Sequence, residues 1–421
     1  SHAASGISTV DPAALSVAAG GRIENLGPGT TSIGVRRTPF TWTNAGTLRA
    51  AAGVLTIADT FTTSGTIDVL GTGRVNLTEA WTNTGTIQLA GSARLDLGGT
   101  FTTAAMGTIS RTGASTTVNI TGQWNNTAAT FNFTAATGSY GLVGGTITGG
   151  TITTAGGAGL IPGNGTNTLV GVAYAGEIVC DGSNSRVRVG AGTTFSGLRI
   201  RGVNGGASFA PGYVISFPIV IEGTGALGTI GLDTLGAGSL TLGPAASITA
   251  VGDWTGTLSV GPSWWDTACA FTNQGTITLA GPSRTLNLGG TSFTNAASGS
   301  ISASAGVIVN ADVQGTDSAN WSSAGSFSVS DGTLHLRDNW SFSANATVTN
   351  TTVNMDGVFA GASALRLQRT AGTVNLAGRL DNTGQTTTLG PTSGSWRLVG
   401  GTIAGGTLAT TATESLLPTN S

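Results

Sequence analysis

Short runs in which apolar and polar residues alternate recur along the chain, and an aromatic residue leads each of them. The clearest example, WTNTGTIQLAGSARLDLGGTF, starts at Trp81, and a close variant, FTNQGTITLAGPSRTLNLGGTSF, starts at Phe271. Each phrase holds two alternating runs separated by turns that contain glycine. A period of two residues is typical of a β-strand with one buried face, and the phrases lack the 3.6-residue period of a helix.

The phrase recurs through much of the chain, and its leading aromatic residues mark the repeats, several of which lie 19 or 20 residues apart. These aromatics are Trp42, Phe61, Trp81, Phe101, Phe271, Phe293, Trp321 and Trp340. In five phrases a glycine follows four residues after the aromatic, at Gly46, Gly65, Gly85, Gly275 and Gly325. Apolar residues follow at fixed positions, so the repeated part indicates a scaffold and not a copied site.

Two strands of this length cannot bury an apolar face alone, so each phrase needs a neighbour to stack against. Parallel stacking at about 4.8 Å satisfies the backbone hydrogen bonds and buries a continuous core. The pattern therefore predicts an all-β fold, a parallel β-helix or β-solenoid with coils of about 20 residues. Roughly 19 such coils would form a rod of about 90 Å. We expect the repeated glycine to supply corner conformations that other residues resist.

Two side-chain ladders are predicted along the stack of coils. An asparagine lies two residues after several of the aromatics, at Asn44, Asn83, Asn273 and Asn295. Stacked asparagines of this kind donate hydrogen bonds from one amide to the next. The leading aromatics are expected to stack in the same way, which adds about 0.5–1.5 kcal/mol per pair beyond the burial of their area.

A longer repeat is superimposed on the coils. Residues 138–165, GSYGLVGGTITGGTITTAGGAGLIPGNG, align without gaps to residues 394–421, GSWRLVGGTIAGGTLATTATESLLPTNS, so the second half is a diverged copy of the first. We divide the chain into N-terminal coils or a cap (1–40), regular coils (41–165), irregular coils with loops (166–270) and a second set of regular coils (271–421). We expect this array to continue into further repeats. AALSVAAGG, after Pro12, suits either a short capping helix or an alternating strand.

Composition and charge narrow the class of protein. Of the residues, 39% are hydrophobic and 9% are charged, which provides material for a core despite 69 glycines. The net charge of −2 gives no electrostatic footprint for nucleic acid or for an anionic membrane. No apolar run approaches the roughly 20 residues of a membrane span. Cys180 and Cys269 allow either one disulfide or two buried thiols.

The aromatic–TN–x–GTI phrase, together with the alternating residues that follow it, resembles the β-helical stalks of large bacterial surface proteins. The families concerned are the filamentous-haemagglutinin-like adhesins and the passenger domains of autotransporters. The resemblance covers more than half of the chain. It implies a right-handed parallel β-helix that is secreted or displayed at the cell surface and that serves as a rod, an adhesin or a matrix component.

An enzymatic function is the main alternative, because parallel β-helices also host polysaccharide lyases and glycoside hydrolases. Such chemistry requires clustered carboxylates, or a carboxylate with arginine, on one face. The repeat places Asp68 and Arg74 of one coil near Arg94 and Asp96 of the next, for which a solvated row of ion pairs is the simpler interpretation. A looser acidic set lacks metal-ligand spacing and comprises Asp312, Asp317, Asp331, Asp338 and Asp356.

Two other features have a structural interpretation. Residues 223–228, GTGALG, match the dinucleotide-binding fingerprint, but the β-branched and glycine-rich sequence that follows does not favour the required helix, and a coil corner explains them better. His2 lies in a stretch that resembles a tag remnant. His335 lies between Leu334 and Leu336, so alternation points it into solvent. We expect no catalytic residue, no cofactor and no metal site.

Two surfaces are candidates for binding. An outward row of Thr47, Thr66 and Thr86 suggests an ice-binding solenoid, but the next outward row, which includes Arg49 and Asp68, carries charges that interrupt a flat array. Adjacent Trp264 and Trp265 cannot both point inward in an alternating strand, so one of them is a candidate platform for a sugar or a protein.

These observations favour a non-catalytic, extracellular or cell-surface rod segment of a large repetitive bacterial protein. The expected partners are other copies of the chain, through end-to-end or lateral assembly, and glycans or proteins of a host or matrix. We expect no nucleic acid partner and no membrane insertion. The alternatives are a carbohydrate-active β-helix enzyme and, less favoured, an ice-binding solenoid. Specificity is expected at the outward residues that change between coils, such as Gln88, Arg94 and Asp96, and in residues 166–270.

Overall fold

The computed structural model of the chain is an all-β solenoid, which confirms the predicted fold class. It describes residues 5–7, 15–34, 40–113, 115–261, 269–311 and 320–419. The solenoid has about 17 turns with coils of about 22 residues, slightly longer than the predicted coil, and is 60% strand and 2% helix. The chain divides into two compact units, a first unit of residues 1–179 and 186–196 and a second unit of residues 180–185 and 197–421.

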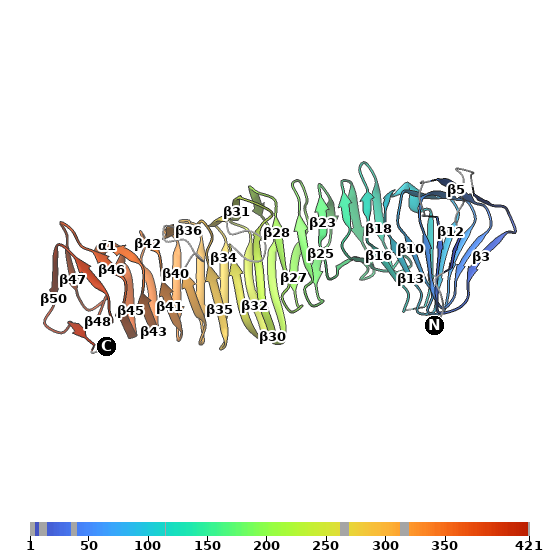
Figure 1. Cartoon of the computed structure of the whole chain (residues 1–421). Coiled ribbons are helices and arrows are strands. Elements are labelled where there is room, and N and C mark those ends of the chain that lie inside the picture. The colour runs from blue at the N-terminus through green and yellow to red at the C-terminus, as the bar shows by residue number, and fades with distance from the viewer. Residues whose placement is uncertain are drawn as a thin grey trace. The chain divides into compact units, whose positions relative to one another are not determined.

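In the first unit, successive coils contribute parallel strands to several sheets (Figure 1). One sheet contains β1 (Ser5–Ile7), β4 (Thr30–Ile33), β7 (Val54–Ile57), β10 (Arg74–Leu77), β13 (Arg94–Leu97), β16 (Thr117–Ile120), β19 (Tyr140–Leu142) and β22 (Leu160–Pro162). A second contains β2 (Ser16–Val17), β5 (Thr41–Asn44), β8 (Thr60–Thr63) and β11 (Trp81–Asn83). A third contains β3 (Arg22–Asn25), β6 (Thr47–Ala50), β9 (Thr66–Val69), β12 (Thr86–Ala90) and β15 (Thr108–Thr112).

The later coils of the first unit use further strands. Three of them, β18 (Thr130–Phe133), β21 (Thr151–Thr154) and β24 (Ala173–Ala175), form one sheet. The remaining strands are β14 (Thr100–Thr102), β17 (Gln123–Asn125), β20 (Thr146–Thr148), β23 (Asn167–Val170), β25 (Glu177–Cys180) and β26 (Arg186–Val189). A short 3₁₀ turn, η1 (Ala104–Met106), lies between β14 and β15.

The second unit has the same parallel organisation. Its sheet of leading strands contains β29 (Tyr213–Ile215), β31 (Gly238–Leu242), β33 (Cys269–Asn273), β36 (Ser292–Asn295), β39 (Asn320–Ser323), β42 (Asn339–Phe342), β44 (Val358–Ala360), β46 (Arg379–Asp381) and β49 (Thr402–Ala404). A smaller pair is β47 (Thr386–Leu389) and β50 (Thr407–Thr410), and a single helical turn, α1 (Gly361–Ala364), follows β44.

The other strands of the second unit all belong to one larger sheet. They are β27 (Gly197–Ile200), β28 (Gly206–Phe209), β30 (Pro218–Thr234), β32 (Ser247–Val260), β34 (Thr276–Ala280), β35 (Arg284–Leu288), β37 (Ser300–Ser304), β38 (Ile308–Ala311), β40 (Ser326–Ser330), β41 (Thr333–Leu336), β43 (Ala346–Met355), β45 (Leu367–Leu376), β48 (Trp396–Leu398) and β51 (Leu416–Pro418). The fingerprint-like residues 223–228 lie inside β30, between the part that pairs with β27 and the part that pairs with β28. Gly223, Gly225 and Gly228 have positive φ there, so these residues form the predicted corner.

Each regular coil contains three strands, whereas the sequence pattern predicts two. The coil that begins at Trp81 contains β11, β12 and β13. The additional strand, β11, is formed by the first three residues of the phrase, Trp81–Asn83. Trp81 and Asn83 are buried on either side of an exposed Thr82, and because the inward Asn83 is polar, apolar and polar residues do not alternate along the strand.

The apolar positions of the repeat form the core, as the alternation predicts. Equivalent residues of successive coils lie in register, for example Leu55, Val75 and Leu95 on β7, β10 and β13. All three are fully buried. Because every inward residue packs on its equivalent in the coils before and after it, the core continues through the coils of each unit.

The leading aromatics stack within each unit, as predicted. In the first unit the ring centroids of Trp42 and Phe61 lie 5.0 Å apart, and those of Trp81 and Phe101 lie 4.8 Å apart. In the second unit the stacked pairs are Phe271–Phe293, Phe293–Trp321 and Trp340–Phe359. The two rings of each pair are near-parallel, with interplanar angles of 5–24°. Stacking of this kind stabilises buried aromatic pairs.

The predicted reason for the corner glycines is wrong. None of Gly46, Gly65, Gly85, Gly275 and Gly325 has the left-handed backbone conformation that was expected. They are required instead by close approach, because a Cβ at Gly65 would lie 2.0 Å from the carbonyl oxygen of Gly46 in the preceding coil. The same overlap occurs at the other four positions, with separations of 1.9–2.3 Å from a backbone oxygen.

The predicted asparagine ladder is present in the second unit. Asn273 Nδ2 donates to Asn295 Oδ1 at 2.8 Å, and Asn295 Nδ2 donates to Ser323 Oγ at 2.9 Å. In the first unit the amides have other acceptors, because Asn44 donates to Thr63 Oγ1 and Asn83 donates to a backbone carbonyl. For Asn44, Asn83 and Asn273, the side-chain Oδ1 accepts from the N–H of the corner glycine two residues later, at 3.0–3.2 Å.

Two ambiguities of the sequence are resolved. In the N-terminal segment, the described part of AALSVAAGG contains the strand β2 and not a helix, and residues 8–14 lie outside the described residues. Cys180 and Cys269 are both free and buried, so they form two buried thiols and not a disulfide.

Burial of ionisable groups predicts a loss of stability at alkaline pH. Burial raises the pKa of the Cys180 thiol from 9.0 to about 12 and that of Tyr140 from 10.0 to about 12. The folded state therefore holds these protons more tightly than the unfolded state does. This stabilisation is complete below about pH 9 and is lost as the pH rises toward 12. Urea denaturation at a series of pH values should show a constant midpoint up to pH 9 and a falling one above it.

A thiol-modifying reagent provides the companion measurement. Ellman's reagent is expected to leave Cys180 unmodified in the native chain at pH 8 and to modify it after unfolding. A Cys180→Ala variant should show a smaller fall in stability above pH 9. An equally steep fall in that variant would contradict the assignment to Cys180.

Candidate polar site on the outer face of the first unit

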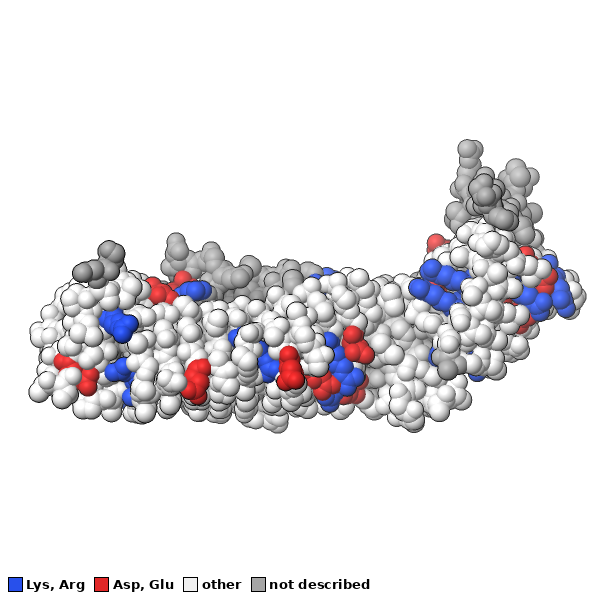
Figure 2. All heavy atoms as spheres, turned by 90° about the horizontal axis from the view of Figure 1, so that it is seen from below, with Lys and Arg blue, Asp and Glu red and all other residues white. Residues whose placement is uncertain are grey.

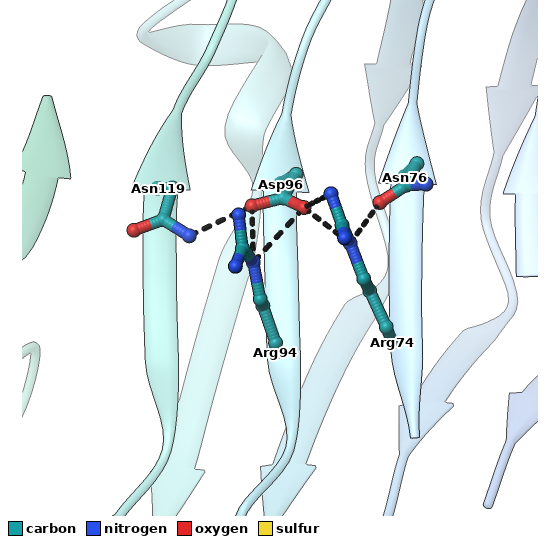
Figure 3. Close-up of polar contacts among 5 residues, drawn as sticks. All are labelled: Arg74, Asn76, Arg94, Asp96 and Asn119. Carbon is teal, nitrogen blue, oxygen red and sulfur yellow. Dashed lines mark hydrogen bonds and ion pairs between the residues drawn. The ribbon is translucent and has the colours of Figure 1, made fainter. Parts of the chain in front are cut away.

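Three adjacent strands of the first unit gather the most concentrated set of polar side chains that the sequence singled out. β10, β13 and β16 pair in parallel, and their register aligns Asn76, Asp96 and Asn119 in one outward row. Arg74 and Arg94 align in the row two residues earlier. Figure 3 shows these five side chains reaching toward one another across the three coils.

The carboxylate of Asp96 is the centre of this cluster. It accepts hydrogen bonds from Arg74 Nε at 2.6 Å, from Arg94 Nε at 2.9 Å and from Asn119 Nδ2 at 2.7 Å (Figure 3). Arg74 Nη2 also lies 2.6 Å from Asp96 Oδ2, and Arg74 Nε contacts Asn76 Oδ1 at 2.7 Å. Both carboxylate oxygens are therefore engaged by neighbouring side chains.

Burial differs sharply within the cluster. The Asp96 side chain is only 4% exposed, whereas those of Arg74 and Arg94 are 40% and 42% exposed. A carboxylate that is enclosed by donors in this way is suited to hold its neighbours together. A general acid or base must instead reach the substrate's proton within hydrogen-bond distance.

The prediction that Asp68 would join this cluster is wrong. Asp68 lies on β9, which belongs to a different sheet from β10, so the corner between the strands separates it from Arg74. Its partner is Arg49, at 2.8 Å, and Arg49 also contacts Glu24 at 3.2 Å. The hydrogen bond to Asp68 is the main cause of the raised pKa of Arg49. This second row is the charged row predicted to interrupt the threonine array.

The threonine rows have the predicted register in the first unit, with Thr47, Thr66 and Thr86 aligned on β6, β9 and β12. In the second unit the equivalent outward row contains an uncharged stretch of Thr278, Ser302 and Ser328, but the same row also includes Arg199. Charged side chains therefore occur in this row in both units. Ice binding stays a prediction.

The looser acidic set does not converge on a metal site in the part of the chain that the structure describes. Asp356 contacts His335 Nδ1 at 3.1 Å, and Asp331 accepts from Asn350 at 2.8 Å. His335 points outward, as predicted, but its side chain is only 25% exposed because Asp356 and Asn354 flank it. Asp312, Asp317, Trp264, Trp265 and His2 lie outside the described residues.

Asn119 completes the cluster, and the sequence pattern did not identify it. The residues after Phe101 lose the regular phrase, so Asn119 could not be aligned with Asp96 by spacing alone. A signal was nevertheless present: Asn119 is the polar residue between two apolar residues in TVNI, as Asp96 is in RLDL. Counting strands from that pattern would have placed the two side by side.

No protein family model matches the chain, and no curated protein matches it at a significant level. Among its described helices, none has the length and apolar character needed to span a bilayer. We therefore infer function from the fold and from the geometry of the outer faces.

Proposed function

We propose that this chain is a structural segment of a large repetitive bacterial surface protein, located outside the cell, in which it adds length and presents a nearly uncharged surface for adhesion. The observation that carries the proposal is that the carboxylate of Asp96 is buried and fully engaged by hydrogen bonds from neighbouring side chains. Its buried carboxylate binds three side chains from three successive coils and acts as a tie between them. This polar cluster thus links successive coils.

Other polar rows support the same function. In the second unit, Asn310 donates to Asn287 at 2.9 Å and Asn375 donates to Asn354 at 2.8 Å, so outward amides also link successive coils. Most of the face shown in Figure 2 is neither acidic nor basic, and the charged side chains lie in small clusters of both signs. A surface of this kind is suited to a long extracellular segment that contacts other copies of itself, glycans or proteins through its neutral hydroxyl and amide groups.

The carbohydrate-active enzyme is the alternative, and substitution of Asp96 discriminates between the two functions. Asp96→Asn preserves the size of the side chain but removes the charge that pairs with two arginines. We expect the free energy of unfolding of the first unit to fall by about 2 kcal/mol, because charge-assisted hydrogen bonds are replaced by unfavourable amide contacts. Urea denaturation measures this change.

The matched control is Glu24→Gln, because Glu24 also pairs with arginine but is 25% exposed. Its expected effect is below about 1 kcal/mol. Release of reducing ends from a panel of polysaccharides is measured in parallel. Depolymerisation by the parent chain that is lost in Asp96→Asn, with stability unchanged, would contradict the structural function and support the enzyme.

A further inference from the structure

A groove of about 740 Å³ lies beside the polar cluster on the first unit. Its floor is formed by the outer faces of β16 and β19, and the corner before β16 and the turn before β19 form its walls. The volume lies within the range of pockets that hold small ligands. The sequence pattern does not predict this groove.

Glycine keeps the floor of this groove open. The outward row that carries Asp96 and Asn119 continues to Gly141 on β19. A Cβ at Gly141 would lie 2.4 Å from Asn119 Oδ1, so the amide oxygen of Asn119 reaches over the glycine. In Figure 3 this oxygen points away from Asp96, because the amide nitrogen donates to the carboxylate. Asn119 therefore presents an acceptor to the groove.

The other polar lining is complementary to a hydroxylated ligand. Thr117 is exposed and Ser139 is half-buried, and both line the groove together with Asn119. Val143 and Ile161 add apolar contact area, and Ile161 is 47% exposed. Apolar surface with a few convergent hydroxyl and amide groups is the usual composition of a site for a small polar molecule.

Arg111 gives the groove a positive charge. It occupies an inward position, in register with Leu89, and its guanidinium turns into the corner, where it donates to Thr116 Oγ1 and to the carbonyls of Thr137 and Ser139. All its hydrogen-bond partners within the described residues are neutral, and burial lowers its pKa. A charged residue at a core-facing strand position is the sequence signal that would have revealed it.

The neighbouring cluster adds to this charge. Arg94 lies in register with Thr117 at the edge of the groove, and Arg74 and Arg94 share the single carboxylate of Asp96. Arg74 and Arg94 pair with Asp96, and Arg111 lines the groove beside them, so these four residues carry three positive charges and one negative charge. The chain as a whole has a net charge of −2, so this local excess favours an anionic ligand.

The second copy of the repeat provides an internal comparison. The gap-free alignment of residues 138–165 with 394–421 pairs Gly141 with Arg397. The structure agrees, because Asn375 lies in register with Arg397 as Asn119 does with Gly141. A long side chain is therefore accepted at this position of the coil, and only the first copy leaves it open.

We propose that the groove of the first unit binds an acidic saccharide, with the sugar hydroxyls against Thr117, Asn119 and Ser139 and the carboxylate in the positive field of Arg111 and Arg94. This inference rests on the adhesive part of the proposed function and assigns it a site and a ligand class. The structural part does not depend on it.

The test is calorimetric titration of the full chain with trigalacturonic acid and with its neutral methyl ester. We expect saturable binding of one acid molecule per chain and about tenfold weaker binding of the ester. Raising the salt from about 50 to about 500 mM should weaken binding of the acid, because the charges lie in the mouth of an open groove. Equal binding of acid and ester would overturn the assignment to an acidic ligand.

Two variants locate the site. Gly141→Leu fills the floor and is expected to weaken binding at least about tenfold, whereas Arg397→Leu, at the equivalent position of the second copy, should leave it unchanged. Thr117→Val removes one hydroxyl from an exposed strand position and should weaken binding about threefold with an unchanged melting temperature. Unaltered binding in both first-unit variants, or no binding by the parent chain, would refute the site. Neither result would alter the stability expected for Asp96→Asn.

Discussion

Replacing Gly85 with alanine is expected to reduce the free energy of unfolding of the first unit by about 3 kcal/mol, the upper end of the usual cost of overpacking. A Cβ at this position would lie 1.9 Å from the carbonyl oxygen of Gly65 in the preceding coil. That oxygen accepts a hydrogen bond from the N–H of Thr86 at 3.2 Å, so neither coil can move away without breaking the ladder. Urea denaturation measures the loss, and hydrogen exchange should place it in the coils on either side of β12.

Gly27→Ala is the matched control for this prediction. Gly27 is in the same unit and has an ordinary backbone conformation, and a Cβ added to it would meet no other atom within 4 Å. Its replacement is expected to change the stability by less than about 0.5 kcal/mol. Equal effects of the two substitutions would show that close approach between coils is not the reason for the corner glycine.

Replacing Asn295 with leucine is expected to reduce the stability of the second unit by about 3 kcal/mol, although the two side chains are similar in size. Asn295 is fully buried. Its Oδ1 accepts from Asn273, and its Nδ2 donates to Ser323 Oγ at 2.9 Å and to the carbonyl of Ser326 at 3.0 Å. Leucine would leave these buried partners with unsatisfied polar atoms, and each such atom carries a desolvation penalty.

The control for Asn295 is Asn310→Leu. Asn310 also belongs to an amide ladder and donates to Asn287 Oδ1 at 2.9 Å, but it is half-buried on the outer face. Water can replace the lost bond there, so the expected loss is below about 1 kcal/mol. Thermal and urea denaturation of both variants provide the comparison. A loss at Asn310 as large as that at Asn295 would contradict the importance of burial in the ladder.

The fold was predictable because its determinants are local and repeated. Alternation identified inward residues such as Leu55, Val75 and Leu95, and the spacing of the aromatics identified successive coils. A buried row of equivalent residues has a similar apolar composition from coil to coil, so one phrase predicts the next. The third strand escaped detection because one of its inward positions holds a polar residue, as with Asn83 beside Trp81 in β11, so apolar and polar residues do not alternate along it.

The candidate site was predictable only in part. Spacing brought Arg74, Arg94 and Asp96 together correctly because these residues lie on equivalent strands of successive coils. It placed Asp68 wrongly, because a corner between β9 and β10 turns that side chain onto another sheet, where Arg49 is its neighbour. In a solenoid, side chains lie next to each other when they occupy equivalent positions on equivalent strands of successive coils. Two residues that are close in sequence within one coil can lie on different sheets.

The sequence by itself determined the all-β solenoid, the inward and outward residues of the regular coils and the stacking of their aromatics, because each depends on a short pattern repeated at a nearly constant interval. Only the tertiary structure decided why Gly85 must be a glycine, what surrounds Asp96 and where the groove beside Asn119 opens. These features depend on distances between backbone atoms of neighbouring coils and on the direction of corners. Such distances arise when the coils stack, and no single phrase contains them.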